Sequence, residues 1–287
     1  MRSLLSRFDL HAPANLTDAL EILSSEPAIW RPFAGGTDLM VLLEAGKLPP
    51  GKYLSLHGLP ELRGIEVTDD QIVLGSMTTY SDVMRSEAVR TDCPLVSRAA
   101  AETGGVATQN RGTIGGNIAN ASPAADTPPT LLVYDAVVEL VSIRGVRRVP
   151  YDRFHLGYKH MDLAPDEILR SIRLVRGRGG WSQTWRKVGT RRAQAISKLC
   201  LAAAVDITGA AVHDIRIALG SVAPTVVRAG RAEAAMRGRT LNEETIAAGC
   251  DALAQDIVPI DDLRSTATYR LRVARNLLEQ FLTSAVR

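Results

Sequence analysis

The most informative feature of this chain is the stretch Arg111-Gly-Thr-Ile-Gly-Gly-Asn-Ile-Ala-Asn-Ala-Ser-Pro-Ala-Ala-Asp126. It combines glycines, small hydroxyls, two amides and one carboxylate in sixteen positions. A second segment, Arg31-Pro-Phe-Ala-Gly-Gly-Thr-Asp-Leu39, has the same character. Glycine lets the main chain approach a ligand closely and turn its N–H groups toward an anion. The two segments together indicate one ligand that is rich in phosphate and hydroxyl groups.

The sequence around the second segment predicts a strand that leads into a helix. Residues 29–33 have the composition of a short strand, and the apolar pattern of residues 39–43 indicates a helix that ends at Gly46. We expect Thr37 to cap that helix. A loop in this position brings unpaired N–H groups and the helix dipole to one place, which favours an anion.

Neither segment fits the common nucleotide fingerprints. The chain has no Gly-x-Gly-x-x-Gly motif after a strand and no Gly-Lys-Ser or Gly-Lys-Thr sequence, which argues against a Rossmann site and a P-loop. Each segment alone is equally compatible with a tight turn or a bulge. An anion site in this chain must therefore be of another type.

The composition is that of a globular protein of 287 residues, with 46% hydrophobic and 23% charged residues. Aromatic residues are 5% and the net charge is +3 without a dense Lys/Arg run, which argues against nucleic-acid binding. No apolar run approaches the roughly 20 residues that span a bilayer. Residues 1–7 contain no long apolar run typical of a signal peptide. We therefore expect a cytoplasmic protein.

The metal-binding residue types are dispersed. Cys93, Cys200 and Cys250 form no Cys-x-x-Cys pair, and the five histidines are scattered. This pattern argues against a disulfide framework, an iron–sulfur cluster or a zinc site. We expect no metal on this chain, so any redox metal has to lie on a partner.

Periodicity predicts several further elements. Residues 15–23 read as a helix that Thr17 can cap, and residues 65–67 and 71–74 read as a hairpin. Residues 177–180 fall in the glycine-rich run 176–180, which is typical of a linker. After it we expect strands at 184–188, 199–207 and 215–221, and an amphipathic helix at 269–284.

Taken together, the two glycine segments resemble the FAD-binding medium (M) subunit of the molybdenum hydroxylases, the xanthine dehydrogenase and carbon monoxide dehydrogenase group. Four later segments resemble that family in the same order. They are Leu163-Ala-Pro-Asp-Glu-Ile-Leu169, Arg186-Lys-Val-Gly-Thr-Arg-Arg192, Ile215-Arg-Ile-Ala-Leu-Gly-Ser-Val-Ala-Pro-Thr225 and Ser265-Thr-Ala-Thr-Tyr-Arg270. The resemblance covers nearly the whole chain.

The resemblance implies an α+β fold. It consists of a two-subdomain FAD-binding fold of the vanillyl-alcohol-oxidase (PCMH) type and a smaller α+β C-terminal domain with a short antiparallel sheet and helices. The implied FAD-binding domain covers residues 1–176, with subdomains at about 1–58 and 59–176. The implied C-terminal domain covers residues 181–287.

The resemblance also implies the cofactor site, with FAD between the two subdomains. Residues Pro32, Phe33, Ala34, Gly35, Gly36, Thr37, Asp38 and Leu39 would wrap the pyrophosphate with main-chain N–H groups. Thr113, Ile114, Gly115, Gly116 and Asn117 belong to the segment that would hold its other side. Asp126 would accept hydrogen bonds from a ribose or ribityl hydroxyl. Ile168 and Leu169 would touch the ring system, and Lys187 would lie near the isoalloxazine or the phosphates.

Several of these residues have ordinary structural interpretations as well. Asp38 and Asp126 also fit turn-closing roles, Ile168 and Leu169 fit a core, and Lys187 fits a solvated basic face. No residue of this chain is assigned a catalytic role, because the cofactor carries the redox chemistry.

The function implied by the resemblance is electron transfer. A large molybdopterin subunit would hydroxylate the substrate, and a small subunit with [2Fe–2S] clusters would carry electrons to the FAD of this chain. The FAD would pass them to NAD⁺ or another acceptor, in a complex expected to be a dimer of heterotrimers. Two alternatives stay open: a stand-alone flavin-dependent oxidoreductase with its own substrate pocket, and a binding protein that has lost the flavin.

Overall fold

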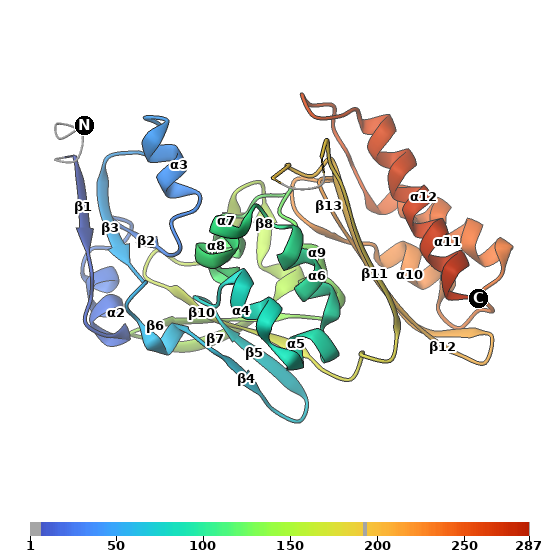
Figure 1. Ribbon diagram of the computed structural model, residues 1–287, viewed down its shortest axis with the longest axis horizontal. Coiled ribbons are helices and arrows are strands. Elements are labelled where there is room, and N and C mark those ends of the chain that lie inside the picture. Colours follow the sequence, from blue (N-terminus) through green and yellow to red (C-terminus); the bar gives the residue numbers. More distant parts are fainter. Residues whose placement is uncertain (1–6, 192–193, 287) are drawn as a thin grey trace.

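Three sheets follow one another along the molecule in a computed structural model, which describes residues 7–191 and 194–286 (Figure 1). The N-terminal sheet lies at one end, a central five-stranded sheet with most of the short helices lies in the middle, and the C-terminal sheet with three helices lies at the other end. Arg192 and residues 1–6, on which two of our expectations fell, lie outside the described residues.

The N-terminal sheet is parallel and has the order β1-β3-β2. Its elements are β1 (Phe8–His11), α2 (Leu16–Ser25), β2 (Trp30–Phe33), α3 (Leu39–Glu44) and β3 (Gly51–Ser55). The expected strand and both helices are confirmed, but both expected caps are wrong. Asn15 caps α2 by accepting the N–H of Asp18. Asp38 occupies the cap position of α3 without a side-chain hydrogen bond, so Thr37 is displaced from that role.

The central sheet is antiparallel and has the order β4-β5-β10-β6-β7. Its strands are β4 (Ile65–Val67), β5 (Gln71–Gly75), β6 (Val137–Ser142), β7 (Gly145–Pro150) and β10 (Ile168–Val175). Helices lie against it: η1 (Pro60–Leu62), α4 (Tyr80–Arg85), α5 (Glu87–Asp92), α6 (Pro94–Glu102), α7 (Val106–Arg111), α8 (Ile114–Ala119), α9 (Pro128–Val133) and η2 (Tyr151–Arg153). A small hairpin joins β8 (His155–Gly157) to β9 (His160–Met161). The expected hairpin at β4 and β5 is confirmed.

The opening stretch is not one continuous loop, because its middle forms the helix α8. Thr113 caps this helix: its Oγ1 accepts the N–H of Gly116 at 3.0 Å. A threonine cap can start a helix even where two glycines follow, since it satisfies one of the unpaired N–H groups. The glycines were the reason that the sequence suggested a loop.

The C-terminal sheet is antiparallel and has the order β11-β12-β13-β14. Its strands are β11 (Ser182–Val188), β12 (Leu199–Thr208), β13 (Ala211–Gly220) and β14 (Val227–Arg228). Three helices cover one face: α10 (Gly230–Met236), α11 (Glu243–Asp256) and α12 (Ala267–Ala285). The three expected strands are confirmed. The expected face of α12 is buried at Ala274, Leu278, Phe281 and Leu282.

The largest hydrophobic core contains residues from both sides of the glycine-rich run 176–180. It includes Leu131 and Tyr134 of the central part and Trp185, Cys200 and Ala218 of the C-terminal sheet. The run itself is anchored, because Arg178 is buried and donates to the carbonyl of Val133 at 2.6 Å. A linker at 177–180 remains a proposal. None of the helices in the described ranges is long and apolar enough to cross a membrane.

Candidate functional site

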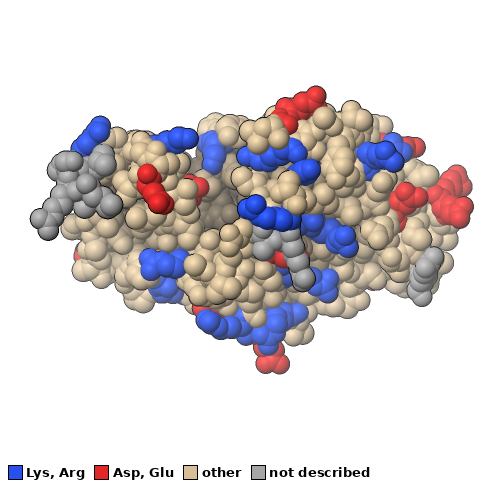
Figure 2. Space-filling view, turned by 45° about the horizontal axis from the view of Figure 1, so that its top comes forward, with Lys and Arg blue, Asp and Glu red and all other residues tan. Residues whose placement is uncertain are grey.

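A cavity of about 280 Å³ lies where the N-terminal sheet meets the central part. Figure 2 shows a hollow in this region with Lys and Arg side chains near its rim. The lining residues are Pro32, Ala34, Gly35, Gly36, Thr37, Asp38, Leu39, Leu56, Ser76, Met77, Tyr80, Gly112, Thr113, Gly115, Gly116, Asn117, Ala119, Asn120, Leu163, Glu167, Ile168 and Leu169. The cavity therefore brings together both glycine segments and the 163–169 segment.

The two glycine segments touch each other through main chain. A Cβ atom on Gly35 would overlap with the carbonyl oxygen of Arg111. Gly112 sits between two side chains, since a Cβ there would lie 2.9 Å from the Tyr80 ring and 3.3 Å from Oγ1 of Thr37. Close approach of this kind requires residues without a side chain. The glycines thus hold the two walls of the cavity together.

The main-chain N–H groups of residues 34–39, which follow β2, have no acceptor among the described residues. Gly36 adopts a left-handed φ of 76°, which turns the chain inside this run. Successive unpaired N–H groups on a concave turn attract an anion. This segment can therefore bind a phosphate through its backbone.

In the stretch 111–126, by contrast, the N–H groups of residues 114–117 donate to other atoms of the protein. The N–H of Ile114 donates to the carbonyl of Thr78 at 3.0 Å, and the N–H of Gly115 donates to that of Ser76 at 2.9 Å. The N–H of Asn117 donates to the carbonyl of Thr113, also at 3.0 Å. This stretch therefore supplies a wall of the cavity whose main-chain N–H groups at residues 114–117 are already paired.

Two of the expected contact residues lie behind the lining. Ile114 is fully buried in the core that includes Leu74 and Ile118. The ring of Phe33 packs beneath Gly36, where a Cβ atom would lie 2.8 Å from the ring. Both side chains support the walls, and neither is among the residues that line the cavity.

Asp126 and Lys187 also lie outside the lining, and they bind each other. Lys187 Nζ lies 2.6 Å from Asp126 Oδ2, and the exposed fractions of the two side chains are 3% and 10%. Ser197 Oγ donates to the other carboxylate oxygen at 2.5 Å. Burial raises the pKa of Asp126, an effect that Lys187 and Ser197 oppose. The expectation of a solvated basic face at Lys187 is wrong, because its ammonium group is buried and paired.

Tyr80 connects this buried pair to the cavity. It lines the cavity, and burial followed by the negative charge of Asp126 raises the pKa of its hydroxyl. The charge of Asp126 therefore acts on a residue that lines the cavity. Whether Asp126 and Lys187 contact the ligand directly stays a prediction.

The sequence did not point to several lining residues. Leu56, Ser76, Met77 and Tyr80 come to the cavity from the ends of β3 and β5 and from α4. Ser76 follows β5, and its buried Oγ has no hydrogen-bond partner in the described residues. These are ordinary residue types at ordinary spacings, so only the tertiary structure identifies them.

The β8–β9 hairpin contacts the C-terminal end of α8, beside the cavity. Lys159, between β8 and β9, donates to the carbonyl and to Oδ1 of Asn120, and Asn120 lines the cavity. His155 Nε2, in β8, lies 3.0 Å from the carbonyl oxygen of Ile118, in the last turn of α8. Burial lowers the pKa of Lys159, and the nearby Asp38 opposes that shift. The hairpin thus places a cation against Asn120, one of the lining residues.

Comparison with protein families agrees with this geometry. The family described as "FAD binding domain in molybdopterin dehydrogenase" matches residues 6–174, and "CO dehydrogenase flavoprotein C-terminal domain" matches residues 185–285. The chain belongs to the FAD-binding subunits of the molybdenum hydroxylases. It is therefore the FAD-binding component of an oxidoreductase, and its α+β fold is confirmed.

Relatives of this FAD-binding subunit span nearly its full length. The xanthine dehydrogenase FAD-binding subunit of Escherichia coli O157:H7 is 31% identical, over 96% of this chain and 95% of the relative. The carbon monoxide dehydrogenase medium chain of Hydrogenophaga pseudoflava is 30% identical, over 97% of both chains. A solved structure of carbon monoxide dehydrogenase from Hydrogenophaga pseudoflava superposes with a TM-score of 0.93 at 32% identity, over 97% of both chains.

The residues present in this subunit fit FAD. The unused N–H groups of residues 34–39 suit a pyrophosphate, and the glycines remove the side chains that would occupy the approach. Ser76 offers a buried hydroxyl beside the cavity that has no hydrogen-bond partner among residues 7–191 and 194–286. Ile168 and Leu169 supply an apolar surface for a ring system.

Proposed function

We propose that this FAD-binding subunit receives electrons from a [2Fe–2S] subunit and passes them to NAD⁺. The whole chain has three cysteines, whereas one [2Fe–2S] cluster takes four cysteine thiolates. All three are buried, and burial raises the pKa of Cys93 to about 12 and that of Cys250 to about 11. The iron–sulfur centres therefore belong on another chain, and electrons reach the flavin from that chain.

The proposed partners are a large molybdopterin subunit and a small [2Fe–2S] subunit, assembled as a dimer of heterotrimers. Support comes from the relatives named as a medium chain and as subunit alpha of a dehydrogenase complex. Co-expression with the neighbouring reading frames, followed by measurement of the native mass, tests this assembly. A mass that equals the sum of one copy of each subunit would contradict the dimer.

The run of unused N–H groups at residues 34–39 carries the proposed cofactor contacts. These residues would hold the pyrophosphate, and Thr113, Gly115, Gly116 and Asn117 would form the opposite wall. Ile168 and Leu169 would contact the ring system, and Asp126 and Lys187 would supply charge at the inner end. When bound, FAD supplies the electron-transfer chemistry, and the protein orients it and shields it from water.

Anaerobic titration of the FAD-loaded subunit with NADH tests the proposed acceptor. Electron transfer to NAD⁺ has a reverse reaction, so NADH is expected to bleach the absorbance of the oxidised flavin. NADPH serves as the matched control for dinucleotide specificity. A flavin that stays oxidised in excess NADH, yet is reduced by the assembled complex with its substrate, would contradict NAD⁺ as the acceptor.

The alternative is a stand-alone flavin-dependent oxidoreductase with its own substrate pocket. Turnover of a small reducing substrate by the isolated subunit would support it. Relatives named for xanthine and for carbon monoxide are similar to this chain to nearly the same degree. That result favours a flavin site independent of the oxidised substrate, as expected where another subunit binds that substrate.

A further inference from the structure

The short helix α9 carries a carboxylate close to each of its ends. Asp126 lies two residues before its first residue, Pro128, and Asp135 lies two residues after its last, Val133. All six residues of the helix are buried. Both carboxylates precede the glycine-rich run 176–180, yet their charged partners all come from that run or from the C-terminal sheet.

The first end is fastened to β11 and to the segment before β12. Asp126 pairs with Lys187 and accepts a hydrogen bond from Ser197. The carbonyl of Asp126 also accepts the indole N–H of Trp185 at 3.3 Å. This end is the one proposed to lie beside the flavin.

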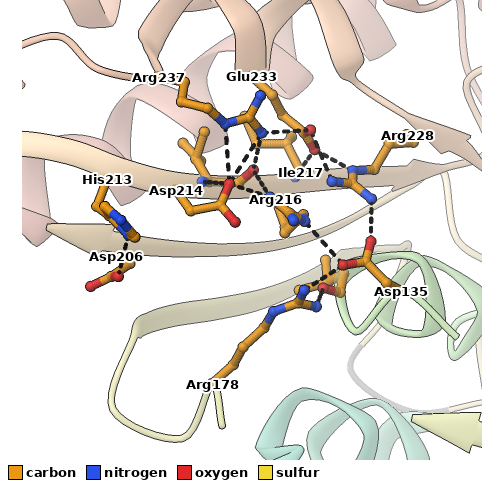
Figure 3. A network of polar contacts seen from close by, with 12 residues as sticks. Asp135, Arg178, Asp206, His213, Asp214, Arg216, Ile217, Arg228, Glu233 and Arg237 are labelled. Carbon is orange, nitrogen blue, oxygen red and sulfur yellow. Dashed lines mark hydrogen bonds and ion pairs between the residues drawn. The ribbon is translucent and has the colours of Figure 1, made fainter. Parts of the chain in front are cut away.

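The second end is fastened by three arginines, which converge on Asp135 (Figure 3). Arg228 Nη1 lies 2.6 Å from Oδ1, Arg216 Nε lies 3.3 Å from Oδ2, and Arg178 pairs with Oδ2. Asp135 adopts a left-handed φ of 45°, which turns the chain out of the helix toward β6. Cations at the C-terminal end of a helix interact favourably with its last carbonyl groups, which have no partner inside the helix. Arg178 does so here, because its Nη1–H donates to the carbonyl of Val133 at 2.6 Å.

The arginines continue into a second set of carboxylates (Figure 3). Arg216 pairs with Asp214, and Arg228 pairs with Glu233 of α10. Burial alone would raise the pKa of Asp135, but Arg178, Arg228 and Arg216 outweigh it and lower that pKa. Asp135 is therefore ionised at neutral pH and ties α9 to β13 and β14.

We infer that Asp135 is a positioning residue which, through α9, holds Asp126 and Lys187 in place at the flavin site. The inference rests on the proposed placement of that pair beside FAD. Ion pairs with the C-terminal sheet hold both ends of α9, a buried helix of six residues. Loss of the ion pairs at Asp135 therefore shifts the helix and, with it, Asp126. Buried packing transmits such shifts because it leaves no free volume to absorb them.

Asp135→Asn in the FAD-loaded subunit tests the inference, with Asp214→Asn as the matched control. Both variants remove a carboxylate from Arg216, but the ion pairs that Asp214 makes within the described residues are with Arg216 and Arg237, neither of which belongs to α9. We expect Asp135→Asn to weaken FAD binding about 10-fold and to shift the visible flavin spectrum. We expect Asp214→Asn to change FAD affinity less than about 2-fold. Asp135→Glu is expected to restore part of the affinity.

A double-variant cycle separates positioning from a general loss of stability. Ser197→Ala loosens the Asp126 end alone, so its effect on FAD affinity should not add to that of Asp135→Asn if α9 connects the two ends. Should Asp135→Asn fail to fold, Arg216→Gln removes the longest of the three contacts to Asp135 together with the ion pair to Asp214, a loss that the Asp214→Asn control measures separately. It is expected to give a smaller shift in the same direction. Unchanged FAD affinity in the folded variants, or additive effects, would overturn the inference. If the wild-type subunit does not bind FAD at all, the proposed cofactor site itself is refuted.

Discussion

At the scale of single residues, the site depends on glycines, because the absence of a Cβ atom lets backbone segments pack directly against each other. Gly35 lets the two segments touch, and Gly115 packs against Ser76, where a Cβ atom would lie 2.7 Å from its carbonyl oxygen. These contacts are between backbone atoms, which cannot move aside as a flexible side chain can. A side chain at either position forces the cavity walls apart.

Gly35→Ala is expected to abolish FAD binding, because its Cβ atom would overlap with the carbonyl of Arg111. The measurement is the flavin content of the purified protein. Gly58→Ala is the matched control, since nothing lies within 4 Å of the added atom. A Gly35→Ala protein that retains full flavin would show that the two segments can separate without harm.

Lys187→Met is expected to destabilise the fold by roughly 3 kcal/mol, because it leaves the buried Asp126 carboxylate without its cation. Chemical denaturation measures this loss. Combining it with Asp126→Asn should recover part of the stability, since the unpaired charge is then removed as well. Equal stability of the wild type and Lys187→Met would contradict a buried ion pair.

At the scale of elements, caps and short helices place the functional groups. Thr113 starts α8 and so turns a glycine-rich stretch into a wall of the cavity. At the other end of the molecule, Asp262 organises the start of α12. It accepts the Nη2–H of Arg270 at 2.6 Å and the N–H groups of Arg264 and Ser265 at 2.8 and 3.1 Å.

This arrangement predicts a pH dependence of stability. Burial alone would raise the pKa of Asp262, but the hydrogen bonds from Arg270, Arg264 and Ser265 outweigh it and lower the pKa to about 2. The folded pKa thus lies below the unfolded value of roughly 3.9. The contribution of Asp262 is therefore present above about pH 4 and is lost as the pH falls toward about 2.

Asp262→Asn tests this dependence. The variant should lose on the order of 1 kcal/mol at neutral pH, after allowance for solvent screening, and should show a flatter stability curve between about pH 4 and pH 2. Urea denaturation at a series of pH values measures both. Parallel curves for the two proteins would contradict the assigned hydrogen bonds.

At the scale of the whole molecule, the FAD-binding part and the C-terminal sheet share one core. Trp185, Cys200 and Ala218 pack in the same cluster as Leu131 and Tyr134. The shared core explains how Lys187 of β11 can reach Asp126, sixty-one residues earlier in the chain. The charges around Asp135 add a second connection between the same two parts.

A fragment of residues 1–176 is therefore expected to fold poorly and to retain no FAD, although it contains both glycine segments. It would expose the apolar surface that β11, β12 and β13 cover, and it would lack the charged partners of Asp126 and Asp135. Thermal unfolding and flavin content of the fragment measure this. Cooperative melting with bound flavin would show that the proposed domain 1–176 is independent.

The sequence predicted those helices and strands correctly whose pattern of apolar residues lies within a few consecutive positions. The hairpin at β4 and β5, the strands β11 to β13 and the buried face of α12 all follow from alternation or helical periodicity. The caps at Thr17 and Thr37 were wrong, because several neighbouring residues can cap a helix and tertiary contacts choose between them. The helix α8 was missed, because glycine disfavours a helix unless a cap and packing compensate.

The sequence by itself determined the family, the cofactor and the two glycine segments, since these depend on residue types at fixed spacings. The fold was needed to show that the N–H groups of residues 34–39 have no acceptor in the described part of the chain, whereas those of residues 114–117 are paired within the protein. It alone paired Asp126 with Lys187 and gathered three arginines around Asp135. The physical reason is that hydrogen bonds and ion pairs depend on distances in space, and residues far apart in the chain become neighbours only when the shared core forms.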